Sequence, residues 1–199
     1  MSDLALWHDD AHLLRILDAG LLEARTHAGE SAACRAGCFS CCLGPFPITM
    51  HDAARLQRGL EEMHHREPAR AARVHGRAVE AMLALRDGFP GDWSRGVVDE
   101  ASAAELFAER FQMIPCPALD LETGACELYE HRPVACRTYG FAVRIAGVDL
   151  TPCPLNYAGL SEAEIEARRV ELTFGALDAD AIEEGQTVVA AALRPSRDT

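Results

Sequence analysis

The sequence lacks the features of a secreted or membrane-spanning protein. Its first ten residues, MSDLALWHDD, have no positively charged start followed by an apolar stretch, and they turn acidic where a signal peptide would be most apolar. No uncharged apolar run approaches the roughly 18 residues that a membrane-spanning helix needs, and TVVAAALRP near the end is much too short. We therefore expect a cytoplasmic protein with no membrane partner.

Positive charge is also scarce. The 199-residue chain has 31 acidic and 19 basic residues, a formal net charge of −12 and a pI near 5.0. Such a chain has no global basic field to attract nucleic acid, so no nucleic-acid partner is expected. Familiar catalytic and nucleotide-binding motifs are absent too: there is no G-x-G-x-x-G, P-loop, nucleophile elbow or H-E-x-x-H. The sequence therefore leaves open whether the protein is an enzyme, and its catalytic residues stay unknown.

What is present begins with enough apolar sequence for one core. Apolar residues make up 49% of the chain, which predicts a single domain over residues 1–199. Leucines at three- and four-residue steps predict an N-terminal helix within residues 1–30. Thr49 and Asp52 form a capping-box-like helix start, and Pro68 should end that helix before an Ala-rich third one. GFPGDWSRG, with three glycines and a proline, is then the best candidate for a linker.

The second half of the chain mixes short helices with turns. ASAAELFAERFQ predicts a short helix, and apolar residues on both sides of Glu122-Thr123-Gly124 and of Ala146-Gly147 predict two hairpins. RPVACRTYG between them predicts another short helix, and Ser161 begins a capping box for C-terminal helices over residues 161–194. The predicted fold is mostly α: a helical shell around a cysteine-rich metal-binding centre with one or two short β-hairpins.

Eight cysteines fall into two groups of four. The first group is Cys34, Cys38, Cys41 and Cys42, and the second is Cys116, Cys126, Cys136 and Cys153. In a reducing compartment such thiols are better explained by metal binding or redox chemistry than by disulfides. Soft thiolates suit zinc, copper(I) and iron–sulfur clusters. The alternative for a single cysteine is that of a small buried hydrophobe.

The spacing of the cysteines also predicts how they are shared between centres. Cys41 and Cys42 are adjacent, and we expect their side chains to point in different directions, so that one of them reaches another centre or partner. The wide gaps of the second group need a folded chain to bring its thiols together. We therefore predict that at least one centre mixes thiolates from both groups.

Three segments together resemble a known family. CRAGCFSCC, then CPALDLETGACELYEHRPVACRTYG, then CP, are similar to the YkgJ-type cysteine-cluster family, a zinc- or iron-chelating domain. The resemblance covers residues 34–154 as a cysteine-cluster core and implies that all eight cysteines serve a metal site. Larger relatives, the flagellin lysine methylases, are similar in this region and need an iron–sulfur cluster. This chain lacks their extra length, so methylation does not carry over.

Two kinds of metal centre remain open. Zinc would give two closed four-cysteine sites that only fix the fold. A 4Fe–4S cluster takes four thiolates and leaves four for a second centre or for redox work. A chain of this size can bury a core without structural metal sites. We therefore favour an iron–sulfur cluster with a redox or protein-modification-related role, acting on a protein partner. The alternative is a binding module stabilised by structural zinc.

Basic residues near the cysteines complete the candidate site. Arg132 and Arg137 flank Cys136, and they are candidate cofactor-binding residues because a cluster held by four thiolates is net negative. Neighbouring residues on a helix point about 100° apart, so His64 and His65 cannot share a metal and are expected to be solvated. His51 and His131 lie close to cysteines in the sequence and are kept as reserve ligands.

Overall fold

The computed structural model describes residues 3–99, 101–173 and 185–195 of the chain. Helices provide most of its regular structure and the strands are short, which confirms the predicted mostly α class. The chain divides into two compact units. Unit 1 consists of Met1–Arg35 and Val134–Ala179, and unit 2 of Ala36–Pro133 and Asp180–Thr199. Each unit is thus assembled from two segments that are far apart in the sequence. The single domain and the cysteine-rich centre stay predictions.

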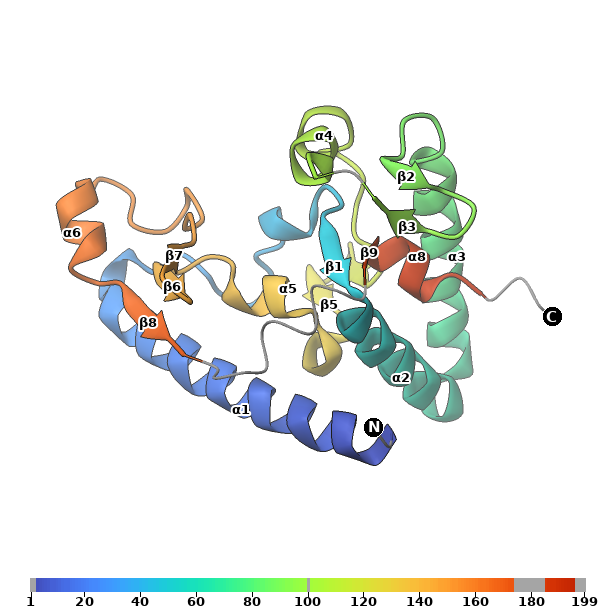
Figure 1. Cartoon of the computed structure of the whole chain (residues 1–199), viewed down its shortest axis with the longest axis horizontal. Coiled ribbons are helices and arrows are strands. Elements are labelled where there is room, and N and C mark those ends of the chain that lie inside the picture. Colours follow the sequence, from blue (N-terminus) through green and yellow to red (C-terminus); the bar gives the residue numbers. More distant parts are fainter. Residues whose placement is uncertain (1–2, 100, 174–184, 196–199) are drawn as a thin grey trace. The chain divides into compact units, whose positions relative to one another are not determined.

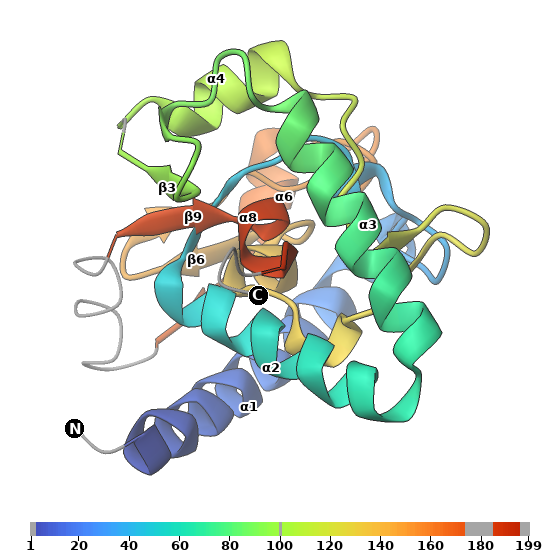
Figure 2. The same ribbon diagram turned by 90° about the vertical axis from the view of Figure 1, so that its right-hand side faces the viewer.

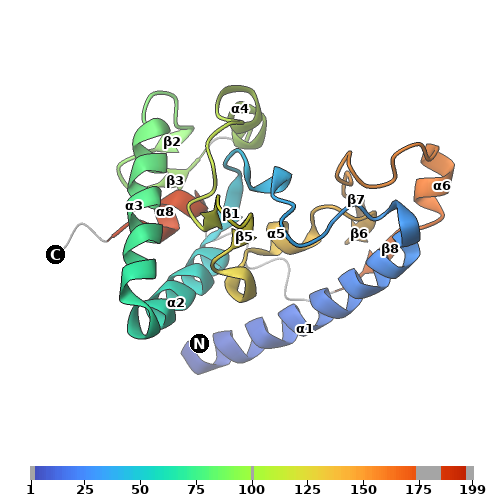
Figure 3. The same cartoon turned by 180° about the vertical axis from the view of Figure 1, so that it is seen from behind.

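Unit 1 is built on a long N-terminal helix. Its elements are α1 (Asp3–Ala28), the 3₁₀ turn η1 (Gly29–Ser31), α5 (Val134–Thr138), β6 (Val143–Ile145), β7 (Val148–Asp149), α6 (Glu162–Glu166) and β8 (Val170–Leu172). β6 pairs antiparallel with β7 and parallel with β8. Figures 1 and 3 show α1 running alongside β8 and α5. Leu17, Val143 and Leu172 are buried in the core between them. The predicted helix end near Gly29 is confirmed.

The C-terminal helices are shorter, within the described residues, than the sequence predicted. α6 begins with the expected capping box between Ser161 and Glu164. Residues 170–172, however, form β8, where buried and exposed positions alternate as on a half-buried strand. Residues 186–188 likewise form a strand, and only 189–193 are helical. The part of the predicted helix that falls on residues 178–184 lies outside the described residues.

Unit 2 contains a bundle of three helices. α2 (Met50–Arg66), α3 (Pro68–Ala84) and α8 (Val189–Leu193) pack against one another, as Figure 2 shows. The Thr49 hydroxyl accepts a hydrogen bond from the Asp52 N–H at 3.0 Å, so the predicted start of α2 is confirmed. Pro68 occupies the first turn of α3, as expected for a residue without an amide donor. The core between these helices is apolar and includes Leu56, Val74 and Leu193.

A small antiparallel sheet lies beside this bundle. Its strand order is β1 (Pro47–Thr49), β9 (Gln186–Val188), β3 (Val97–Val98) and β2 (Gly91–Asp92). The predicted linker GFPGDWSRG is therefore wrong, because it forms the β2–β3 hairpin within unit 2. Gly91 and Gly96 adopt positive φ angles of 136° and 73°, which this turn requires. The Trp93 indole N–H donates to the Met82 carbonyl at 2.6 Å and fixes the hairpin on the end of α3.

The remaining elements of unit 2 are short, and some of them carry cysteines. They are η2 (Ser40–Cys42), α4 (Ala103–Arg110), β4 (Leu119–Asp120), β5 (Ala125–Cys126) and η3 (Tyr129–His131). β4 and β5 pair antiparallel, which confirms the hairpin predicted around residues 122–124, and α4 confirms the short helix before it. No helix in the described part of the chain is long and apolar enough to cross a membrane.

Candidate metal centre

The first cysteine run is held against the segment that carries Cys116. The Cys116 N–H donates to the Cys42 carbonyl at 2.7 Å, and the Gly44 N–H donates to the Ile114 carbonyl at 2.8 Å. Gly44 adopts a φ of 84°, and a Cβ there would lie 3.2 Å from the Gln112 Cα, so glycine is the residue that allows this approach. The pairing brings together two cysteines, one from each group in the sequence.

Cys41 and Cys42 are neighbours in the first cysteine run, and the expectation that one of them reaches another centre stays a prediction. They lie on the tight turn η2, which is closed by a 2.8 Å hydrogen bond from the Cys42 N–H to the Phe39 carbonyl. The Cys42 side chain donates a hydrogen bond to the Cys41 sulfur. This bond, opposed by desolvation and helped by the positive charge of Arg132, lowers the pKa of Cys41 to about 6. The Cys42 thiol and the Arg132 charge therefore favour the thiolate form of Cys41.

Cys116 and Cys126 lie in the same neighbourhood but in an apolar setting. Burial raises the pKa of Cys126, while Arg132 lowers it and the nearby Cys41 raises it. Burial also raises the pKa of Cys116 to about 12, and the nearby Cys126 adds to that increase. Cys41, Cys42, Cys116 and Cys126 thus form one neighbourhood, which we call the unit-2 thiol set. Cys38 lies three residues before Cys41 in the same loop.

Two arginines of α3 hold the hairpin that carries Cys126. The Glu127 side chain is only 6% exposed, and its carboxylate accepts a 2.8 Å hydrogen bond from Arg70 and a second one from Arg77. Arg77 also donates to the Pro117 carbonyl at 2.8 Å, one residue after Cys116. The sequence analysis missed these residues. The available signal was that Arg70 and Arg77 are seven residues apart and hence on one face of the helix.

His131 packs on α2 at a glycine. A Cβ added to Gly59 would lie 2.4 Å from the His131 Cγ, so the imidazole occupies the space that a side chain would need. Burial lowers the pKa of His131, and its Nε2 lies 3.8 Å from Glu62. The contact between His131 and Gly59 positions η3 against α2. Next to it, the Arg132 guanidinium lies 3.8 Å from the centre of the Tyr129 ring. The reserve ligand His131 thus has a packing role in positioning the residue that follows it.

Unit 1 holds the other thiols: Cys34, Cys136 and Cys153. Cys153 is 6% exposed, and its N–H donates to the Gly140 carbonyl at 3.3 Å. The Cys34 sulfur lies 3.3 Å from the point where a Gly140 Cβ would be, so it is next to the same turn. Cys136 lies on α5, four residues before that turn. The buried residue Asn156 forms hydrogen bonds with both Cys34 and Cys153. The sequence analysis missed this residue.

The two arginines predicted beside a cluster have different surroundings. Arg132 belongs to unit 2, and its charge acts on Cys41 and Cys126. Arg137 is buried in unit 1, and its guanidinium donates to the Asp18 carboxylate at 2.6 Å, which joins α5 to α1. A role for either arginine in holding a cofactor stays a prediction.

The chemistry of these donors suits a soft metal. Thiolates bind zinc and iron–sulfur clusters and discriminate against magnesium and calcium. Within residues 3–99, 101–173 and 185–195, no group of three or more Cys, His, Asp or Glu side chains is arranged to hold a metal ion. The thiols are therefore neighbours, not yet in coordination geometry. The unit-2 thiol set offers four donors, the number that a tetrahedral zinc or a 4Fe–4S cluster takes.

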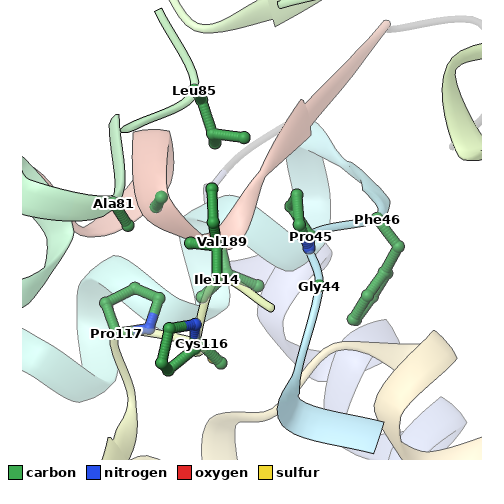
Figure 4. A pocket seen from close by; sticks show the side chains of 11 residues that line it. Gly44, Pro45, Phe46, Ala81, Leu85, Ile114, Cys116, Pro117 and Val189 are labelled. Atoms are coloured by element: carbon green, nitrogen blue, oxygen red, sulfur yellow. The ribbon is translucent and has the colours of Figure 1, made fainter. Parts of the chain in front are cut away.

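A small apolar cavity lies beside Cys116 (Figure 4). Side chains from α3, from α8 and from the segments on either side of the Cys42–Cys116 pairing line it, among them Leu85, Ile114 and Val189. Its volume of about 20 Å³ has room for about one water molecule. The cavity is too small for an organic cofactor.

Residues 33–165 match the family model CxxCxxCC, a predicted zinc- or iron-chelating domain. The match covers more than half of the chain and includes all eight cysteines. No curated protein and no solved structure matches this sequence.

Proposed function

The chain belongs to the CxxCxxCC family of predicted zinc- or iron-chelating domains, and from that premise we propose that its cysteines hold an iron–sulfur cluster of the 4Fe–4S type. The observation that carries the proposal is the unit-2 thiol set, in which two sequence-distant pairs of cysteines, Cys41–Cys42 and Cys116–Cys126, come together. Four thiolates are the complete ligand set of such a cluster. When bound, the cluster supplies one-electron transfer.

The surroundings of the thiol set support a working cluster over a structural zinc. Unit 2 already buries apolar cores around Leu56 and Phe107, so a metal staple is not required to hold it together. The Arg132 charge, close to Cys41 and Cys126, offsets the negative charge of a thiolate-bound cluster. Cys41 itself is exposed, which gives a partner access to that side of the set.

The partner is proposed to be a protein. Leu121 is 58% exposed and Tyr129 is 54% exposed, and they lie on either side of Cys126 in the sequence. Exposed apolar and aromatic side chains of this kind are enriched in protein interfaces. Together with the accessible Cys41, they support a redox or protein-modification-related role toward a partner protein.

Zinc remains the second candidate, because the thiol set has four members and three of them, Cys42, Cys116 and Cys126, are half-buried. A closed four-cysteine zinc site needs no open position and no solvent access. In that case the protein would be a binding module, and the metal would only fix the position of the hairpin.

Anaerobic purification of the full chain separates the two candidates. A brown protein with broad visible absorption and matching iron and sulfide contents is the expected result. Replacement of Cys126 by Ser should abolish the colour, whereas replacement of His64 and His65 by Ala should leave it unchanged. A colourless protein that holds zinc in place of iron and sulfide would refute the cluster and favour the binding module.

A further inference from the structure

Asn156 is a buried amide whose hydrogen-bonding groups are all engaged. It is 4% exposed and is the only asparagine in the sequence. Its Oδ1 accepts hydrogen bonds from the Ala33 N–H at 2.7 Å and the Cys34 N–H at 3.2 Å. Its Nδ2 donates to the Gly140 carbonyl and, at 3.7 Å, to the Cys34 sulfur. Only an amide can accept two bonds on one side and donate two on the other.

The same amide is tied to Cys153 through the backbone. The Asn156 N–H donates to the Cys153 carbonyl at 2.9 Å, and the Cys153 N–H donates to the Gly140 carbonyl at 3.3 Å. Cys34 and Cys153 are therefore attached to one amide and one turn, although more than a hundred residues separate them in the sequence. Gly140 has a φ of 117°, and a Cβ there would lie 3.3 Å from the Cys34 sulfur. The turn is shaped to leave room for that thiol.

We propose that Cys34, Cys136 and Cys153 are ligands of one metal centre in unit 1 and that Asn156 is its positioning residue. The inference rests on the proposed function, in that the cysteines of this chain bind metal. It assigns Cys34 to the distant Cys153 and not to its sequence neighbours Cys41 and Cys42, which belong to the unit-2 thiol set.

The physical argument lies in the N–H···S hydrogen bond and in the fixed backbone. A donor to a ligating sulfur stabilises the negative thiolate, and partners of metal ligands also fix the direction in which the ligands point. Asn156 does both for Cys34 and fixes the backbone at Cys153. Cys136 lies on α5, which ends two residues before Gly140, so its backbone is close to the same turn in the sequence. The three cysteines come from three separate segments of unit 1: two are held at the Gly140 turn, and the third lies four residues before it.

Metal counting on the full chain tests the grouping. The probe is Co²⁺, added anaerobically to metal-free protein and counted by metal analysis and by thiolate-to-cobalt absorption. Each of the single variants C34S, C136S and C153S should lose the same centre. The double variant C34S/C153S should lose no more Co²⁺ than C34S alone, whereas C34S/C126S should lose more, because it damages both units.

Two results would overturn the grouping. One is a C34S/C153S chain that holds less Co²⁺ than either single variant. The other is a C34S/C126S chain that holds as much as C34S alone, which would place all the thiols in one centre. A wild-type chain that binds no Co²⁺ would also overturn this inference. The proposed function fails on a different result, a purified protein that holds zinc in place of iron and sulfide, so the two failures are distinguishable.

The role of Asn156 is tested by N156D in the C126S background, which isolates the unit-1 centre. Ionised Asp still accepts from the Ala33 and Cys34 N–H groups but cannot donate to the Cys34 sulfur. Co²⁺ affinity should fall by about 10- to 100-fold, as is typical when a hydrogen-bond partner of a metal ligand is lost, and the thiolate-to-cobalt band should shift. The matched control is T187V, which removes another buried hydrogen bond, from Thr187 to the Gly96 carbonyl, far from these ligands in the sequence.

An unchanged affinity and band position in N156D would show that Asn156 does not position the centre. An equal loss in T187V would show that the effect is one of general stability. Should N156D fail to fold, the cysteine double variants still decide the ligand grouping, since they do not alter Asn156.

Discussion

Comparing the stabilities of the variants G59A and G76A should separate the steric cost of a new methyl group from its gain in helix propensity. Gly59 and Gly76 both lie inside helices of unit 2, α2 and α3. Replacing either by Ala should gain about 1 kcal/mol from helix propensity. At Gly76 nothing lies within 4 Å of the new Cβ, whereas at Gly59 it would lie 2.4 Å from the His131 ring. Such overpacking costs about 1–3 kcal/mol.

We therefore expect G76A to stabilise the protein by about 1 kcal/mol and G59A to be less stable than G76A by about 1–3 kcal/mol. The assay is denaturant unfolding of both full-length variants at the same metal content. G59A should also bind metal less tightly, because displacing His131 moves Arg132 relative to Cys41 and Cys126. If G59A stabilised the protein as much as G76A does, with metal binding unchanged, the packing of η3 on α2 described above would be incorrect.

Three further outcomes follow from the thiols and histidines. Replacing Cys41 by Ser should lower metal content sharply and lower the melting temperature, because a missing thiolate removes metal-linked folding energy; full occupancy at an unchanged melting temperature would exclude Cys41 as a ligand. Replacing His64 and His65 together should leave metal content unaltered, and metal analysis of the purified variant would reveal any loss. In metal-free protein, alkylation of Cys41 should have its midpoint near pH 6, and Cys42→Ala should move that midpoint upward, as mass spectrometry of the labelled peptide would show. Because the pKa of Cys41 is lowered on folding, its contribution to stability is present above the unfolded value and is lost as pH falls through about 6.

Local signals in the sequence predicted local structure. The caps at Thr49 and Ser161 and the break at Pro68 depend on residues within one helical turn, and all three are found as expected. The hairpin at residues 122–124 is equally local. Strands β8 and β9 were missed because their neighbours in the sheet come from elsewhere in the chain, and short apolar segments do not reveal their partners.

The arrangement of the thiols could be predicted only in outline, as a centre that mixes thiolates from both groups, and its members could not be named for the same reason. Spacing along the chain grouped Cys34 with Cys42, whereas backbone pairing sets Cys42 against Cys116 and the Asn156 amide sets Cys34 against Cys153. Nothing in the sequence around Cys42 encodes the distant carbonyl and amide partners. The candidate ligands could be named from the sequence. Their division between the unit-2 thiol set and unit 1 depends on long-range hydrogen bonds.

The central position of β9 has a consequence for the order in which the chain can mature. β9 lies between β1 and β3 and is the last strand of that sheet to be synthesised. Unit 1 likewise closes only when β8 pairs with β6. Neither unit can complete its fold while the ribosome is still making residues 36–133, although five of the cysteines are in that span. We therefore expect the strands that complete both units, and with them the final positions of the thiols, to form only after residues 36–133 have been made.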